Sequence, residues 1–516
     1  MRETILLESF FSLRISRIFL PFLLITVLIG CGSDRLPVVV KLDATSHPLV
    51  AQYSIKSPNA GQVFVEFGTS TAYGLQTAIF DVAAGTTVPI LVAGMKPSTA
   101  YHMRAKLQID GKVAWIDNDR VFTTGALSVP PPTITVTRGG ASSEAPGVEL
   151  ISFAPPAGSP PVLEALVTDR DGTPLWYYDA PGRIPSFLKL MPNGHFLVAI
   201  SSVDNTIAPG LIREIDLAGN TIRELESTTL AQKLHDAAYA FDFEFFHHDF
   251  IPLDNGHVIV LGETEKDFTD LPGFPGTTTV QGDVLVDLDE NWNPVWAWNA
   301  FDYLDVNRHL MGLPDWTHSN AVVYNPVDGN LMLSIRHQSW IIGIDYQNGS
   351  GSGRVLWRLG EDGDFALDGG DSKHWFYARH FPSMVTSSGS QVSLAVFDNG
   401  NLRVLDDQGT TCGPPPAPAC YTRATLFQFD QSTMQAQLQW QYAPGAFSFW
   451  GGTNNQVPNG NIEFEMSAAF TPVLGSRVME VTQTSGPEVV WQMDLTGGSS
   501  YRTYRIPSLY PSVSWP

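Results

Sequence analysis

The sequence predicts an all-β protein in which a six-bladed β-propeller follows a small β-sandwich. The first observation is composition, because 45 glycines and 37 prolines among 516 residues favour many short strands joined by turns over long helices. The second is an internal repeat of paired hairpins across the C-terminal two thirds of the chain, which is the pattern of a propeller. The third is the length, which suits two or three domains.

Residues 1–30 predict a signal peptide. Arg14 and Arg17 precede the apolar run IFLPFLLITVLIG, which ends directly before Cys31. This arrangement resembles a bacterial lipoprotein signal, in which Cys31 is lipidated, and the alternative is an ordinary cleaved signal beside an incidental cysteine. Either form exports the chain, and Gly32 after the cysteine favours a periplasmic protein anchored in the outer membrane. No later run approaches the about 20 apolar residues of a membrane span.

Residues 31–127 predict the β-sandwich domain. The stretches GQVFVEFG and YHMRAKLQIDGKVAW alternate apolar and polar residues at period two, and DRVFTTG closes the unit. The stretch MKPSTAY, which ends at Tyr101, resembles the tyrosine corner of fibronectin type III domains. Because LSVPPPTITVT is rich in proline, we expect residues 128–147 to form an extended linker.

Residues 148–516 predict the propeller. Hairpins recur as LMPNGHFLVAI, PLDNGHVIVLG, NPVDGNLMLSI, TSSGSQVSLAVF and QVPNGNIEFEM, each with turn residues between alternating runs. A second hairpin follows each of them, and most of these end in tryptophan. Two hairpins make one four-stranded blade, which gives five units from about residue 185 to 495. A further hairpin at 162–178 lacks inner strands, and we expect the C-terminal YRTYRIPSLYP to help supply them and close a sixth blade.

Charge and cysteine content restrict the partners and the compartment. The net charge of −22 argues against a nucleic-acid partner, because nucleic acids select basic surfaces. After Cys31, two cysteines remain, Cys412 and Cys420, on either side of GPPPAPA. In an oxidising compartment they predict a disulfide, and a metal site built from two cysteines in a Pro-rich loop is the weaker alternative.

Three histidines hold the same position in successive units. His247 and His380 lie nine residues before the turn glycines of their units, and His318 lies eleven before the glycine of a turn that is two residues longer. We expect the three side chains to converge at one end of the central channel of the propeller. A lone histidine at a strand start is ordinarily structural, but one position repeated on adjacent blades favours a functional site.

Arg336, in SIRHQSW, adds a cation beside the channel. We expect it in the strand after the turn, where a guanidinium offers a bidentate clamp for an oxyanion, and an ion pair with a carboxylate is the alternative. Strand alternation places His337 on the opposite face, outside the site. Three histidines and an arginine suit a tetrahedral oxyanion, sulfate or phosphate. The same histidines also suit zinc with an open position for water, although an arginine beside a dication is electrostatically unfavourable.

Four segments carry a family resemblance. FFHHDFIPLDNG, DWTHSNAVVYNPVDGNLMLSIRHQSW, LAVFDNGN and YRTYRIPSLYP resemble the bacterial PAPS-independent arylsulfotransferases, and the resemblance extends over residues 130–516. It implies a periplasmic enzyme with a six-bladed propeller and an N-terminal β-sandwich. It also implies transfer of a sulfuryl group between phenols through a sulfohistidine, without a cofactor.

The resemblance also implies roles for particular residues. His380, which precedes FDNGN, is the expected nucleophile, and His318, Asn320 and Arg336 are expected to bind the sulfuryl oxygens. The HHD segment supplies the acid/base.

Within that segment, either His247 or His248 fits the acid/base role, and the repeat position favours His247. The sequence therefore predicts an aryl-sulfate sulfotransferase that works by a ping-pong mechanism on an aryl sulfate donor and a phenolic acceptor. It predicts no metal, no nucleic-acid partner, and membrane contact through the lipid anchor alone. Two alternatives remain: a non-catalytic propeller lipoprotein that binds aryl sulfates, glycans or a protein partner, and a sulfate-ester hydrolase that uses the same site.

Overall fold

The computed structural model describes residues 38–516 except 181–182, 203–209, 407, 414–418 and 470–474. The predicted signal peptide and its Cys31 lie outside this part. The all-β prediction is confirmed, because strands far outnumber the few short helices. Among the described residues, no helix combines the length and the apolar character that crossing a membrane requires.

Residues 39–123 form two antiparallel sheets. One has the order β1-β2-β6 and the other β4-β3-β7-β8, with β5 also paired to β3 and β9 to β7. Alternate side chains of β2 and β7, such as Tyr53 and Met103, enter one shared apolar core. The Lys96 N–H donates a 3.0 Å hydrogen bond to the Tyr101 hydroxyl, the contact expected of a tyrosine corner. The strands are β1 (Val39–Ala44), β2 (Ala51–Lys56), β3 (Gly61–Gly68), β4 (Leu75–Gln76), β5 (Phe80–Val82), β6 (Thr87–Val92), β7 (Ala100–Ile109), β8 (Lys112–Ile116) and β9 (Arg120–Thr123).

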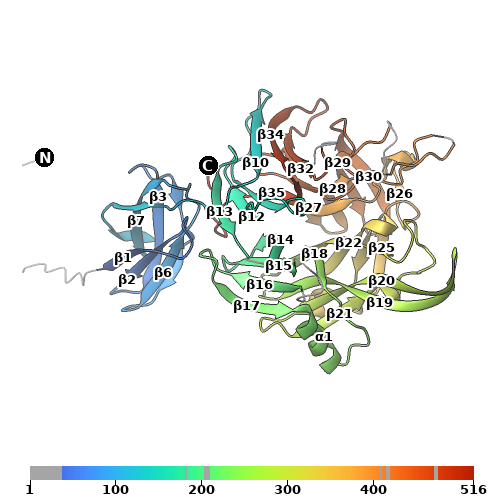
Figure 1. The fold of residues 1–516 in the computed structure, drawn as a ribbon, viewed down its shortest axis with the longest axis horizontal. Coiled ribbons are helices and arrows are strands. Elements are labelled where there is room, and N and C mark those ends of the chain that lie inside the picture. The colour runs from blue at the N-terminus through green and yellow to red at the C-terminus, as the bar shows by residue number, and fades with distance from the viewer. Residues whose placement is uncertain (1–37, 181–182, 203–209, 407, 414–418, 470–474) are drawn as a thin grey trace, which may run out of the picture. The chain divides into compact units, whose positions relative to one another are not determined.

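Five successive stretches each contribute four strands that pair antiparallel in chain order, which confirms the five predicted units of two hairpins (Figure 1). The first three are β14 (Arg183–Leu190), β15 (Phe196–Ser202), β16 (Leu211–Ile215) and β17 (Thr221–Glu226); β18 (Phe246–Pro252), β19 (Val258–Leu271), β20 (Phe274–Leu288) and β21 (Pro294–Asn299); and β22 (Ser319–Asn325), β23 (Asn330–Ile335), β24 (Trp340–Ile344) and β25 (Val355–Leu359). The last two are β27 (His380–Ser388), β28 (Gln391–Asp398), β29 (Arg423–Asp430) and β30 (Gln435–Tyr442); and β31 (Thr453–Gln456), β32 (Ile462–Met466), β33 (Gly475–Val481) and β34 (Val489–Thr496).

Two of these sheets gain an outer strand. β26 (Ala366–Leu367) runs parallel to β30, and β10 (Thr133–Arg138) runs antiparallel to β34. β10 lies inside the segment 128–147 that was expected to be a linker. The expectation of a linker is therefore wrong for residues 133–138. Their alternating TITVT pattern follows the prolines in the chain, and this segment pairs with the sheet.

A sixth sheet joins both ends of the repeat region, with the order β13-β12-β11-β35. The tail strand β35 pairs with β11 from Val148↔Ile506 to Ala154↔Ser499, so the predicted completion of the early hairpin by the C-terminal segment is confirmed (Figure 1). The strands are β11 (Val148–Ala154), β12 (Ala165–Thr168), β13 (Pro174–Tyr178) and β35 (Ser499–Ile506).

Five recurring tryptophans, on every four-strand unit and the sixth sheet except the unit that ends in β17, each connect their strand to a turn of a neighbouring sheet. Every indole N–H in this set donates to an acceptor in the next sheet along the chain, and the last returns to the β12–β13 turn. The pairs are Trp176 to Leu217 O (2.8 Å), Trp296 to Gly351 O (3.2 Å), Trp357 to Gln431 Oε1 (2.9 Å), Trp440 to Thr484 O (3.1 Å) and Trp491 to Arg170 O (2.9 Å). The repeated tryptophan therefore fixes the spacing of successive sheets.

Helical segments are short and lie in the connections between strands. In α1, the apolar Leu230 and Leu234 are spaced i, i+4 and both are buried. The predicted disulfide between Cys412 and Cys420 is present. The helical elements are α1 (Ser227–Asp236), α2 (Ala300–Tyr303) and the 3₁₀ turns η1 (Arg336–Gln338), η2 (Gln347–Gly349) and η3 (Ser372–His374).

Buried charges fix β35 against its neighbours. The Arg505 guanidinium donates to Glu149 of β11 at 2.6 Å and to Glu480 of β33, and Glu463 of β32 lies 3.8 Å away. All four side chains are at most 1% exposed or fully buried. Burial raises the pKa of Glu463 well above its usual value, and the Glu149 charge raises it further. One cation therefore balances carboxylates from three strands.

We predict that Arg505→Met destabilises the fold by about 3–5 kcal/mol, because it leaves buried carboxylates without a cation. Urea unfolding followed by circular dichroism measures the change. The penalty should be smaller at pH 5 than at pH 8, since orphaned buried carboxylates have raised pKa values and are stable when protonated. Arg138→Met, at a side chain that is 43% exposed, is the control and should cost below about 1 kcal/mol. Equal costs for the two variants would contradict the prediction.

Candidate active site

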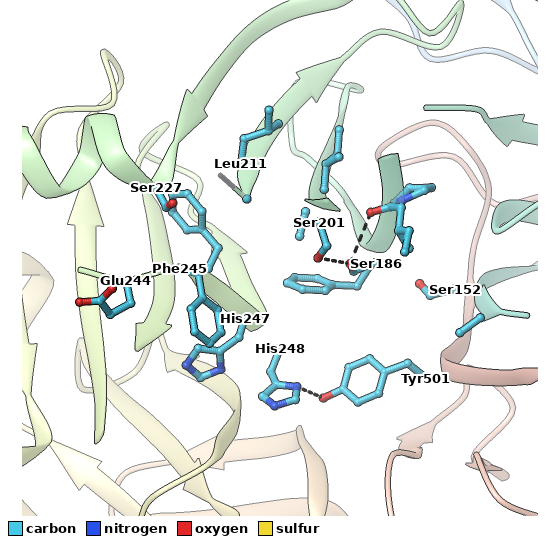
Figure 2. Close-up of a pocket in the computed structure, with 18 of the residues that line it drawn as sticks. Ser152, Ser186, Ser201, Leu211, Ser227, Glu244, Phe245, His247, His248 and Tyr501 are labelled. Atoms are coloured by element: carbon cyan, nitrogen blue, oxygen red, sulfur yellow. Dashed lines mark hydrogen bonds between the residues drawn. The ribbon is translucent and has the colours of Figure 1, made fainter. Parts of the chain in front are cut away.

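A cavity of about 710 Å³ opens beside β14, β18 and β35. His247, His248 and Tyr501 stand at one end of it, and Figure 2 shows the two histidines and the tyrosine side by side. A largely apolar wall and several hydroxyl groups make up the rest of its described lining. The apolar side chains include Phe153, Ile184, Phe187, Leu211 and Phe245. The cavity is therefore largely apolar, with titratable groups at one end.

His248 faces Tyr501. Its Nδ1 lies 2.8 Å from the Tyr501 hydroxyl (Figure 2). The residue has a φ of 53° within an irregular part of β18, where the pairing register shifts between Phe246 and Phe250, so strand alternation does not set the direction of its side chain. Burial lowers the pKa of His248 well below 6.5, and nearby positive charge lowers it further. This histidine is therefore neutral at neutral pH.

His247 has a different environment. Its Nε2 lies 3.2 Å from a carboxylate oxygen of Asp283, and its ring stands edge-on to the ring of His248, 5.0 Å between centroids. Burial acts to lower the pKa of His247, but the Asp283 carboxylate outweighs it and the pKa is raised. The repeat count favoured His247 as the acid/base, whereas the contacts place His248 nearer to the other histidines.

His318 joins this group from the start of β22. Its ring centroid is 4.8 Å from that of His248, and its Nδ1 lies 2.6 Å from a carboxylate oxygen of Asp315. Like His248, it has a left-handed backbone, with a φ of 50°. The side chain is 31% exposed, so the face away from Asp315 is open to a ligand. The Asp315 contact fixes the ring orientation.

Arg336 and His337 require a correction to the sequence analysis. β23 ends at Ile335, and both residues lie in the 3₁₀ turn η1, so strand alternation does not separate them. His337 stacks on His318 with 4.6 Å between ring centroids and 15° between planes. Its Nδ1 donates to the Asp315 carbonyl at 2.7 Å, so its Nε2 carries no proton and accepts from Arg336 Nη1 at 2.7 Å. Burial lowers the pKa of His337 to about 4.

Arg336 presents an unused donor to this group. One terminal nitrogen donates to His337, and the other donates to the Phe449 carbonyl at 3.1 Å. Its Nε is buried and has no hydrogen-bond partner among the described residues. Because an unpaired buried donor is costly, this N–H indicates a place where an acceptor such as an anion binds.

His380, the first residue of β27, has one defined tautomer. The Asn399 amide nitrogen donates to the carbonyls of Ser448 (2.8 Å) and Gly451 (3.1 Å), which orients the Asn399 oxygen toward His380. That oxygen lies 2.7 Å from His380 Nδ1 and can only accept, so Nδ1 carries the proton. His380 Nε2 therefore carries no proton. It accepts a long 3.3 Å hydrogen bond from the Gly451 N–H.

The surroundings also keep His380 neutral. The residue is 3% exposed, and burial lowers its pKa well below 6.5. The Arg336 charge lowers it further, and the His318 and Arg502 charges add to the effect. The Tyr501 ring lies 6.3 Å from the His380 ring and 5.4 Å from the His248 ring, so Tyr501 lies close to both histidines. A neutral imidazole with an unprotonated Nε2 is a nucleophile.

Asn320 is placed behind the site. It is fully buried, its amide nitrogen donates to the Arg379 carbonyl at 2.8 Å, and its oxygen accepts from Ser334 at 2.9 Å. Arg379 in turn donates to the carbonyls of Ile335 (2.7 Å) and Trp340, at the two ends of η1. These bonds hold the backbone on both sides of Arg336 and directly before His380, so Asn320 positions the site.

The donor set fits an anion better than a dication. Among the described residues, the group whose ligand atoms come within 4.8 Å of one another is Asp315, His318 and His337. Both ring nitrogens of His337 are already engaged, one of them by Arg336. The zinc alternative used His247, His318 and His380, but His247 faces Asp283. A guanidinium beside the group would also repel a dication.

Sequence reasoning missed three residues of this site. Tyr501 lies in the tail YRTYRIP and Asn399 lies in FDNGN, and both segments had been recognised as resembling the family without a role for these side chains. His337 was excluded by an alternation rule that a 3₁₀ turn does not obey.

A family model described as Arylsulfotransferase (ASST) matches residues 163–505. This chain belongs to the arylsulfotransferase family. Family membership supports an enzyme of the arylsulfotransferase kind, with aryl sulfates and phenols as the general class of substrates. All of the clustered residues, from His248 to Tyr501, fall inside the matched range.

Other comparisons add nothing to that assignment. No curated protein sequence matches this arylsulfotransferase. Solved structures that align include the exotype rhamnogalacturonan lyase YesX (12% identity, 92% of this chain and 91% of that chain, TM-score 0.25) and a variant of the Synechocystis apocarotenoid oxygenase (11%, 91% and 96%, 0.32). An auxiliary nutrient binding protein from Bacteroides ovatus also aligns (10%, 83% and 94%, 0.29). At these scores the similarity carries no argument.

We predict that His380 of this arylsulfotransferase stays neutral well below pH 6.5, and that Arg336→Gln raises its pKa because a neighbouring positive charge is removed. Nitrogen-15 NMR of labelled histidine measures the titration, and the spectrum of His380→Gln assigns the signal. Arg104→Gln, in the N-terminal sheets, is the control and should leave the titration unchanged. A wild-type His380 that titrates at or above pH 6.5 would contradict the prediction.

Proposed function

We propose that this protein moves a sulfuryl group from an aryl sulfate to a phenolic acceptor by two displacements, independently of PAPS, with His380 as the nucleophile. The observation that carries the proposal is the fixed neutral tautomer of His380, whose Nε2 carries no proton and accepts a long 3.3 Å hydrogen bond from the Gly451 N–H. The Arg336 guanidinium, with an unpaired buried Nε–H, provides the charge that an anionic sulfate ester needs.

In the first displacement, His380 Nε2 attacks sulfur and an N–S bond forms. The bond between sulfur and the aryl oxygen breaks, and the aryl oxygen leaves with the electron pair. Sulfuryl transfer resembles phosphoryl transfer, so charge on the peripheral oxygens and alignment of the two groups decide the rate. Arg336 and the open face of His318 are the proposed donors to those oxygens. Asn320 supports this arrangement through the Arg379 carbonyl.

In the second displacement, the acceptor phenol attacks the sulfur of the sulfohistidine and the N–S bond breaks. His248 is the proposed acid/base: it protonates the leaving phenolate in the first step and takes the proton of the acceptor phenol in the second. Burial and nearby positive charge lower the pKa of His248 well below 6.5. A bound sulfate ester raises this pKa, because an opposite charge stabilises the imidazolium. Tyr501 fixes the His248 ring through its 2.8 Å contact.

The large cavity beside His248 is the proposed aryl site. Its volume of about 710 Å³ lies within the range of small-molecule pockets. Aromatic side chains such as Phe187 and Phe245 line it and favour stacking with aryl rings. Trp316 and Phe381 are not among its described lining residues.

We infer that the six sheets between residues 133 and 506 are the six blades of a propeller, and that residues 31–127 form a fibronectin type III-like sandwich. The first inference is supported by the return contact of Trp491 with the turn at Arg170 and by the pairing of β35 with β11. The second is supported by the Tyr101 contact with Lys96.

We also propose that the protein is exported and anchored by a lipid on Cys31, in the periplasm and on the outer membrane. The proposal rests on the lipoprotein-like signal. The disulfide of Cys412 and Cys420 agrees with an oxidising compartment.

The purified protein should release nitrophenol from 4-nitrophenyl sulfate, and added phenol should increase the release. Without acceptor, tryptic peptide mass spectrometry should find a sulfated His380 peptide. His380→Gln should lower the turnover by about 10³-fold or more. His102→Gln, at a histidine paired with Asp119 in the N-terminal sheets, is the matched control and should retain full activity.

The alternatives give different outcomes in the same assay. No release by folded protein overturns the enzyme proposal and favours a binding lipoprotein. Release that ignores phenol and yields free sulfate favours a hydrolase. Loss of activity with a chelator would return the zinc alternative.

We predict that His248→Gln slows transfer from phenyl sulfate far more than from 4-nitrophenyl sulfate, by about 10²-fold against less than about tenfold, because the better leaving group needs less protonation. Steady-state rates with both donors measure the difference. His247→Gln should slow both donors equally. The reverse pattern would assign the acid/base role to His247.

A further inference from the structure

A second cavity of about 660 Å³ lies along the inner strands that carry the proposed active site, and it shares no described lining residue with the first. β14 contributes Lys189, β18 contributes Asp249 and β27 contributes Phe381. None of the clustered histidines lines it. The turn residues Asp254 and Asn255 also line it and are exposed, so the cavity opens at the turn between β18 and β19.

Two cations and one anion meet at Asp249, in the lining of the cavity. Asp249 accepts from Lys189 Nζ at 2.6 Å and from Arg502 at 2.9 Å. The exposed fractions of these side chains are 16% for Lys189, 1% for Asp249 and 3% for Arg502. The three buried groups carry a net charge of +1. Asp254, at the exposed rim, is the other carboxylate of the described lining.

The pairing of Asp249 does not explain why Lys189 is there. Asp249 already has the Arg502 guanidinium and the Val322 N–H at 2.9 Å, which satisfy its charge and both oxygens. Burial lowers the pKa of Lys189 and the Asp249 charge only partly compensates, so the ammonium is held at a cost. Within the described part of the chain, Asp249 is its one polar partner, which leaves two of its three N–H groups for a ligand.

The walls around this ammonium are apolar and partly aromatic. The Phe381 ring lies 5.8 Å from Lys189 Nζ and stacks on Tyr504, with 5.8 Å between centroids and 28° between planes. Ile251, Val322 and Pro382 add aliphatic surface. An apolar pocket with one convergent charged group is the usual form of a site for an amphipathic small molecule.

We propose that this second cavity binds an aromatic monoanion of the aryl carboxylate class, with the carboxylate on Lys189 and the ring against Phe381. The single net positive charge matches one negative charge, whereas a dianion such as phosphate meets the Asp249 carboxylate with its second charge. The apolar walls disfavour an inorganic anion and a neutral sugar. The site is independent of sulfuryl transfer and of the sulfate ester bound near His380.

Isothermal titration calorimetry of the chain without its predicted signal peptide, residues 31–516, with naphthalene-2-carboxylate tests the proposal. The wild type should bind one equivalent with a Kd at or below about 1 mM. Naphthalene-2-carboxamide, the neutral isostere, should bind at least about tenfold more weakly, because it lacks the charge that Lys189 recognises.

Two variants test the site from opposite ends. Lys189→Met removes the ammonium and should weaken binding of the carboxylate by at least about tenfold. Leu253→Trp, at the half-buried rim, fills the cavity without changing its charge and should also abolish binding, so the test stands even if Lys189→Met does not fold. Circular dichroism checks the fold of each variant. Lys56→Met, at an exposed lysine of β2, is the matched control.

The outcomes separate this site from the first cavity. His248→Gln, which alters the first cavity, should leave the affinity for naphthalene-2-carboxylate unchanged. The proposal is overturned if the wild type does not bind, if the carboxamide binds equally well, or if both cavity variants bind like the wild type. Binding that is lost in His248→Gln and kept in Lys189→Met assigns the ligand to the first cavity and also overturns it.

Discussion

The arrangement of the site depends on the ion pairs and hydrogen bonds of the buried Asp249 carboxylate. It stands on β18 and binds Lys189 of β14, Arg502 of β35 and the Val322 N–H of β22. Arg502 continues the connection to the Asn320 carbonyl, and the Asn320 amide reaches the carbonyl directly before His380. Inner strands of five sheets are therefore tied by one set of buried polar bonds. Because each bond would leave an unsatisfied charge or amide if broken, the strand ends keep the spacing that brings three histidine-bearing segments together.

The positions of these buried charges also determine which histidines of the site hold a proton. Buried cations at Arg336 and Arg502 lie close to imidazoles that are themselves buried, and both effects disfavour the imidazolium form. Asp283 acts in the opposite direction on the pKa of His247, which it contacts. His247 beside Asp283 holds a proton more readily, and His248 and His380 do not. The site therefore holds two neutral imidazoles, His248 and the proposed nucleophile His380, beside one histidine that is more readily protonated.

The sequence identified which segments meet, and it was less informative about which side chains face one another. The repeat count located His318 and His380 correctly at strand starts because turn glycines and hairpin lengths are local features. It favoured His247 over His248, but an irregular stretch of β18 redirects consecutive side chains and brings His248 against His318. It placed Arg336 in a strand because SIRHQSW has strand-like neighbours, whereas the chain turns there as η1. Asn399 and Tyr501 act through contacts that are 19 and 253 residues apart in the chain, and no local pattern reports such distances.

The departures from the repeat are as informative as the repeat itself. Where three units place histidine, the neighbouring units have Pro185 and Gly451. Pro185 has no donor and lines the first cavity, so the unit without an imidazole leaves room for an apolar substrate. Gly451 contributes its backbone N–H to His380 Nε2, and its φ of 62° together with a Cβ position 2.2 Å from Ser467 Oγ excludes a side chain there. Histidines at this position in all five units would surround the site with like groups. A proline and a glycine in place of two of these histidines make the site asymmetric. Charge and imidazoles lie on one flank and apolar surface on the other, which suits the proposed substrate with its anionic end and its aryl end.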